Sequence, residues 1–191
     1  MQTILELGAA RVFYDGILAE PRLDHSEGLA VRRDGSVWCG GERGQIYRIE
    51  ADGSSIEQAA SSAGFSHGMA FDADDNLYVC DSYAFKESGP GIFRFDPDGS
   101  GELWYDEPIN FANGLALSPD GDHLYVAETF ANAIFRIPIE EDGSAGAHEE
   151  VTHLPGVLPE GWPSIPKAIC TSPATNRARC SASPPTGRLC A

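Results

Sequence analysis

Short apolar strands separated by polar turns recur three times along the chain, always in the same order. Each copy opens with Gly-Leu-Ala or Gly-Met-Ala, continues through a turn into a second strand, and then reaches a strand of the form Ile-aromatic-Arg. The openings occupy residues 27–30, 67–70 and 113–116, so they start 40 and 46 residues apart (27 to 67, and 67 to 113). A period of this size with about four short strands per copy predicts the blades of a β-propeller.

The later strands and turns support the same organisation. Second strands are expected at 36–39, 77–80 and 124–127, and third strands at 46–49, 92–95 and 134–137. Asp-Gly pairs follow at five places and supply the positive φ that tight hairpins need. No segment has a helical period. We therefore expect an all-β chain with a first strand and connection from Val12 to Leu23, and three blades that end near Leu154.

The pattern stops where a fourth copy is due, at Glu160 and Gly161. Residues 162–191 contain five Pro and three Cys and show no strand alternation. In a neighbouring reading frame their codons allow Gly-Leu-Ala followed by Gly-Asn-Leu-Tyr-Val, which would be the missing copy. We therefore interpret residues 1–161 as a partial propeller and residues 162–191 as an irregular or disordered out-of-frame tail. The nucleotide sequence of the gene tests this frameshift hypothesis, because codons that exclude this reading would refute it.

The charge of the chain limits the classes of partner. Asp and Glu number 29 against 13 Lys and Arg, which gives a net charge of −16 and an isoelectric point near 4.5. Nucleic acids and anionic membranes both require a basic surface, so neither is an expected partner. An acidic surface can hold cations, although solubility alone explains the charge equally well. The chain start has no basic segment followed by a cleavage-like site, so we expect a cytoplasmic location.

The openings Glu27-Gly28-Leu29-Ala30 and Asn113-Gly114-Leu115-Ala116 resemble those of the SMP-30/gluconolactonase/LRE-like family. The resemblance extends from about Phe13 to Gly161. It implies a six-bladed β-propeller, a chain about half as long again, one divalent cation on the central axis, and in most members the hydrolysis of lactones. This chain would then hold an incomplete ring of about three blades of that six-bladed type, followed by an irregular C-terminal tail.

The resemblance also implies a set of site residues. The metal ligands of the family fall at the residue before the Gly of an opening, which here gives Glu27, Asn113 and Glu160. The family usually has Asp at the last of these positions, and its role there makes Glu160 the candidate general base. Carboxylate and amide oxygens suit Ca²⁺, which is the expected cation, with Mg²⁺, Mn²⁺ and Zn²⁺ as alternatives.

The second blade departs from the family. Its sugar lactonases carry Arg-x-Asn-Asp-Gly where this chain has Gly64-Phe65-Ser66-His67-Gly68. Ser66 and His67 are therefore expected to bind substrate, and His67 has two further candidate roles, as a metal ligand or as a proton shuttle. Because the Arg that grips the substrate is absent, the resemblance supports a lactone hydrolase but leaves a sugar-acid lactone substrate in doubt.

These observations predict a divalent-metal-dependent hydrolase that acts on a small-molecule lactone. The alternative is a non-catalytic propeller of the NHL type, which binds a protein or small-molecule partner and does not need acidic residues before the Gly. Glu27 and Asn113 discriminate between the two functions. A partial ring also exposes blade faces and strand edges. We therefore expect the chain as written to be an inactive, aggregation-prone fragment, and its oligomeric state is not indicated.

Overall fold

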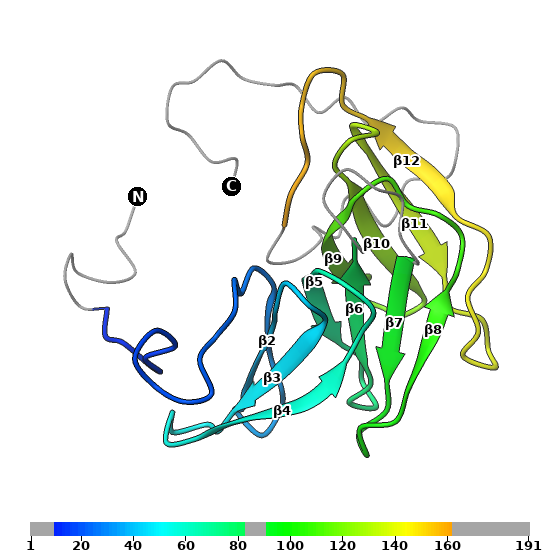
Figure 1. Cartoon of the computed structure of the whole chain (residues 1–191). Helices are drawn as coiled ribbons and strands as arrows, with labels where there is room; N and C mark the ends of the chain where they lie inside the picture. Colours follow the sequence, from blue (N-terminus) through cyan, green and yellow to red (C-terminus); the bar gives the residue numbers. More distant parts are fainter. Residues whose placement is uncertain (1–9, 83–90, 162–191) are drawn as a thin grey trace, which may run out of the picture.

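The computed structural model describes residues 10–82 and 91–161, and within these ranges the chain is all-β (Figure 1). Twelve strands form three four-stranded antiparallel sheets, as the repeat predicted. The first sheet contains β1 (Leu29–Val31), β2 (Val37–Gly40), β3 (Gln45–Ile49) and β4 (Ile56–Ser61). The second contains β5 (Ser66–Phe71), β6 (Leu77–Asp81), β7 (Gly91–Phe95) and β8 (Gly101–Tyr105). The third contains β9 (Ala112–Leu117), β10 (His123–Glu128), β11 (Ala133–Pro138) and β12 (Glu149–His153).

Each sheet is one propeller blade. Its four strands are hydrogen-bonded in chain order, and the first strand of each blade lies innermost, with β1 against β5 and β5 against β9. Figure 1 shows the blades as an open fan with β4, β8 and β12 at its outer edge. The structure thus confirms an incomplete propeller ring. The predicted out-of-frame tail, residues 162–191, lies outside the described residues.

The Asp-Gly turns form as predicted. Their glycines all have positive φ, between 72° and 87°: Gly35, Gly53, Gly99, Gly121 and Gly143. In the turn at Asp98, the carboxylate accepts hydrogen bonds from the backbone N–H and the hydroxyl of Ser100, at 2.9 Å and 2.6 Å. These two hydrogen bonds lower the pKa of Asp98 below its usual value. The turns therefore satisfy their own polar groups and set the strand register.

The expected first strand between Val12 and Leu23 is wrong. Turns occupy this stretch, because the carboxylate of Asp15 accepts the backbone N–H groups of Ile17 and Leu18, at 3.1 Å and 3.0 Å. Asp side chains that bond backbone groups two or three residues ahead favour turns over strands. Tyr14 and Leu23 nevertheless pack against the apolar residues of the first blade.

Apolar side chains fill the spaces between neighbouring blades. The largest cluster joins the second and third blades, where the Tyr78 and Trp104 rings meet edge to face at 5.0 Å. A second cluster joins the first and second blades around Ile46, Met69 and Val79. Burial between blades is the main stabilising term of such a fold. The described residues include no helix that is long and apolar enough to cross a membrane.

Two cysteines of the described region lie in this core, and we expect their thiols to be protected. Cys39 is 3% exposed and Cys80 is fully buried, and burial raises the pKa of both thiols. A buried, protonated thiol reacts only when the structure opens. Alkylation of both should be at least about 100-fold slower in the native protein than in concentrated guanidinium chloride. Peptide mapping by mass spectrometry measures this, and equal rates would show that the blades do not form stably.

Candidate functional site

The glycine of each opening lets the innermost strands of neighbouring blades touch backbone to backbone. A Cβ atom on Gly28 would overlap the carbonyl oxygen of His67, and one on Gly114 would overlap the carbonyl oxygen of Glu160. The same relation joins Gly68 to the carbonyl oxygen of Asn113. His67, Asn113 and Glu160 therefore occupy equivalent positions, each pressed against the glycine of the preceding blade. This contact confirms that Glu160 is in phase with the repeat.

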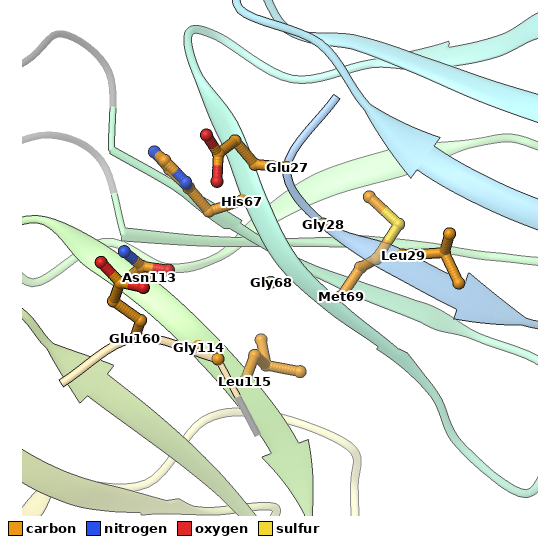
Figure 2. A pocket seen from close by; sticks show the side chains of 11 residues that line it. Glu27, Gly28, Leu29, His67, Gly68, Met69, Asn113, Gly114, Leu115 and Glu160 are labelled. Atoms are coloured by element: carbon orange, nitrogen blue, oxygen red, sulfur yellow. The ribbon is translucent and has the colours of Figure 1, made fainter. Parts of the chain in front are cut away.

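A cavity of about 290 Å³ lies along this row of glycines. Its lining comes from all three openings and from the segment after β12: Glu27, Gly28, Leu29, His67, Gly68, Met69, Asn113, Gly114, Leu115, Glu160 and Gly161. In Figure 2 the side chains of the four residues that precede the glycines lie on one side of the glycine row, and those of Leu29, Met69 and Leu115 lie on the other. The structure thus brings Glu27, Asn113 and Glu160 to one pocket, together with His67.

The two carboxylates of the pocket are held in different ways. The Glu27 side chain is 49% exposed, and its carboxylate lies 3.2 Å from Nε2 of His25. Glu160 is exposed, and its backbone is anchored by the buried Thr129, whose hydroxyl donates a 2.8 Å hydrogen bond to the carbonyl oxygen of Pro159. Glu27 can therefore reorient as a flexible side chain, whereas the position of Glu160 depends on the contact between the last described segment and the third blade.

His67 is the buried polar side chain of the pocket. It is 3% exposed, and neither ring nitrogen has a hydrogen-bond partner among the described residues. Its ring lies between Phe65 and Phe111, with centroid distances of 4.1 Å and 4.8 Å. Burial lowers the pKa of His67 below its ordinary value, and the negative charge of Glu27 opposes this shift. Burial therefore favours the neutral imidazole, in which one ring nitrogen carries a free lone pair.

Ser66, the other predicted substrate-binding residue of the second blade, lies outside the pocket lining. Its side chain is fully buried, and its hydroxyl shares a 2.8 Å hydrogen bond with the hydroxyl of Ser62. It is absent from the described residues that line the pocket. Its expected role in substrate binding stays a prediction.

Two acidic residues that support the site were not identified from the sequence. The buried carboxylate of Asp81 accepts the backbone N–H groups of Ala63 and Gly64 at 2.8 Å and 2.7 Å, which orders the loop before β5. Glu128 has the same place in the third blade and accepts the N–H of Asn110 at 2.6 Å. The sequence did contain a signal that could have identified Asp81 and Glu128, because each is the last residue of the second strand of its blade.

The donor set of the pocket fits a divalent cation. It offers two carboxylates, one amide oxygen and one imidazole nitrogen, which are the groups that bind divalent ions in proteins. Among the described residues, no three His, Cys, Asp or Glu side chains already lie close enough together to hold a metal ion. The carboxylate of Glu27 is instead engaged by His25. Binding would therefore require the half-exposed Glu27 side chain to turn from His25 to the pocket.

Comparisons with known proteins identify a family and individual proteins that this chain resembles. Residues 84–161 match the family described as the SMP-30/Gluconolactonase/LRE-like region. Lactonase drp35 of Staphylococcus epidermidis is 31% identical over 130 residues, which are 63% of this chain and 40% of that protein. Pentonolactonase XacC of Haloferax volcanii is 28% identical over 140 residues, 70% of this chain and 47% of that protein. The chain thus spans less than half the length of these curated relatives.

Solved structures share the fold. A structural-genomics protein assigned as a gluconolactonase superposes with a TM-score of 0.61 at 21% identity, over 72% of this chain and 53% of that chain. The calcium-binding protein regucalcin of Agrobacterium tumefaciens gives a TM-score of 0.54 at 17% identity, over 68% and 46%. Both share the fold of this chain over the superposed part. The family assignment rests on the sequence matches: residues 84–161 belong to the SMP-30/gluconolactonase/LRE-like region, and the solved structures agree in fold.

Proposed function

We propose that this chain carries the cation site of a divalent-metal-dependent lactonase. The observation that carries the proposal is the convergence of Glu27, Asn113 and Glu160 on one pocket from equivalent positions of successive blades. The matched relatives are named as lactonases, and one structural neighbour is described as a calcium-binding protein. A single divalent cation is therefore the proposed cofactor, and a small lactone is the proposed substrate.

The proposed chemistry divides between the cofactor and the residues of the chain. A bound divalent cation would polarise the lactone carbonyl and lower the pKa of a nearby water. Glu160 would act as general base, taking a proton on its carboxylate as the water oxygen bonds to the carbonyl carbon. The ring C–O bond would then break, and the leaving oxygen would take the proton held by Glu160, which gives a hydroxy acid and restores the carboxylate. Glu27 and Asn113 would hold the cation, and Glu160 both holds it and accepts the proton.

We also propose that hydrolysis of the lactone requires further blades besides the three that the structure describes. Leu29 and Val31 of the innermost strand of the first blade are 64% and 61% exposed, so the open side of this blade presents apolar surface. Exposed apolar residues in this position would be covered by the next blade of a closed ring. We therefore propose that the chain holds the cation donors, while hydrolysis needs the further blades that complete the wall of the pocket.

Calorimetry and a lactonase assay test this function together. We expect the chain to bind one cation, with Ca²⁺ and Mn²⁺ titrated separately, because all the proposed donors lie within it. A version extended by the remaining blades should also hydrolyse an aliphatic lactone in a pH-stat assay, whereas the chain alone should not. Failure of both proteins to bind either cation would refute the metal-dependent lactonase and favour a partner-binding propeller. Cation binding without hydrolysis by the extended protein would refute the catalytic step alone.

A further inference from the structure

We propose that His67 is a further donor of the cation site, and that its nitrogen makes the site select a late first-row transition ion such as Co²⁺ or Zn²⁺ over Ca²⁺. This inference rests on the proposed cation site and concerns which class of ion that site takes. Of the three roles that the sequence left open for His67, it selects that of a metal ligand.

The position of His67 in the repeat is the first argument. His67 precedes Gly68 just as Glu27 precedes Gly28 and Asn113 precedes Gly114. Its carbonyl oxygen packs on Gly28 in the same way that the Asn113 carbonyl oxygen packs on Gly68. Because the backbones are equivalent, the His67 side chain starts from the same place relative to the axis as the other donors. Figure 2 shows it on the same side of the glycine row.

The unsatisfied ring nitrogens of His67 are the second argument. Both are buried without a hydrogen-bond partner among the described residues. Buried polar atoms are normally hydrogen-bonded, and leaving one unpaired costs roughly 1–3 kcal/mol. A histidine with a purely structural role would be expected to bond a backbone or side-chain group. His67 instead lines the same pocket as Glu27 and Glu160, which is the environment of a cation ligand.

The surroundings of His67 keep this donor rigid and neutral. Phe65 and Phe111 pack on the imidazole, and Phe111 adopts a positive φ of 66°, which is costly for a bulky residue. Asp81 orders the loop that leads to Phe65. An imidazole must be neutral to bind a metal, and the burial of His67 favours the neutral form.

The choice of ion follows from ligand chemistry. Ca²⁺ takes six to eight oxygen ligands, so an imidazole nitrogen at the site occupies a position where Ca²⁺ prefers oxygen. Late transition ions accept imidazole nitrogen readily, and Zn²⁺ is commonly four-coordinate. Two carboxylates, one amide and one imidazole are therefore better matched to Co²⁺ or Zn²⁺ than to Ca²⁺. His25, the other histidine near Glu27, is exposed and already shared between Glu27 and Glu42, at 3.2 Å and 3.6 Å.

The test compares ion preference in wild-type protein and two variants, with Zn²⁺, Co²⁺ and Ca²⁺ titrated by calorimetry and Co²⁺ also by its visible absorption. Wild-type protein should bind Zn²⁺ and Co²⁺ more tightly than Ca²⁺. His67→Asn should lose about 100-fold in Zn²⁺ affinity and change the Co²⁺ spectrum. His67→Asp should reverse the preference by making every donor an oxygen, and a variant that fails to fold cannot gain Ca²⁺ affinity. Each protein is checked by thermal melting.

Two histidine variants serve as controls. His153 is exposed on the outer strand β12, so His153→Asn should leave ion binding unchanged. His25→Asn should not lower Zn²⁺ affinity, since it releases Glu27 from its ion pair. Tight ion binding by wild-type protein that is unaltered in folded His67→Asn, or that is lost only in His25→Asn, would overturn the inference. Absence of ion binding in the wild-type protein would overturn the cation site itself, and this inference with it.

Discussion

Substitution of Gly68 by Ala is expected to destabilise the chain by about 3 kcal/mol or more. The new Cβ would overlap the carbonyl oxygen of Asn113 and would lie 2.6 Å from the backbone nitrogen of Leu115. Both atoms belong to the backbone of β9, which cannot rotate aside as a side chain does. The strands β5 and β9 would therefore have to separate.

That separation would open the largest apolar cluster of the protein. The cluster lies between the second and third blades and includes the fully buried Ile92, Leu124, Val126 and Ile137. Interiors pack at near-crystalline density, so a shift of the inner strands costs contacts along the whole interface. It would also move Asn113 relative to His67, and we expect cation binding to weaken with stability.

Urea unfolding followed by tryptophan fluorescence measures the Gly68 effect. Gly121→Ala is the matched control, because Gly121 has a φ of 82° and a Cβ there would meet no atom within 4 Å. The loss of stability in Gly121→Ala therefore measures only the backbone strain of an Ala with positive φ, which is about 1–2 kcal/mol. If Gly68→Ala is no more destabilising than Gly121→Ala, then the close backbone contact between the blades does not exist in solution.

Substitution of Glu27 by Gln is expected to reduce cation affinity by about 100-fold or more while leaving the fold intact. The change keeps the shape of the side chain but removes one of the two negative charges of the pocket. The Glu27 side chain is 49% exposed, and its contact with His25 lies at the surface, where such a contact contributes little to stability. The variant therefore separates binding from folding.

The same region supplies a control for Glu27. Glu42 also pairs with His25, at 3.6 Å with a side chain that is 56% exposed, but it is not among the described residues that line the pocket. Calorimetric titration should show unchanged affinity for Glu42→Gln. A similar loss in both variants would indicate that the acidic surface attracts cations in general. Unchanged affinity in Glu27→Gln would remove Glu27 from the site.

The periodicity of the sequence was sufficient to predict the strands and turns of the blades, because each of them is encoded by a few neighbouring residues. Alternating strands, Asp-Gly turns and the glycine of each opening all act within a few residues, and the structure has each of them where the pattern placed it. The stretch from Val12 to Leu23 was assigned wrongly, because its apolar residues suggested a strand while the local hydrogen bonds of Asp15 favour turns.

The sequence also predicted that residues before the opening glycines lie together, because equivalent positions of neighbouring blades converge wherever the repeat is regular, and the structure has them in the lining of one pocket. Only the tertiary structure decided how each of them is held. The burial of His67 between Phe65 and Phe111 and the support of the β5 loop by Asp81 join residues from different strands and blades. Such contacts depend on packing between distant segments, and no local pattern in the sequence encodes them.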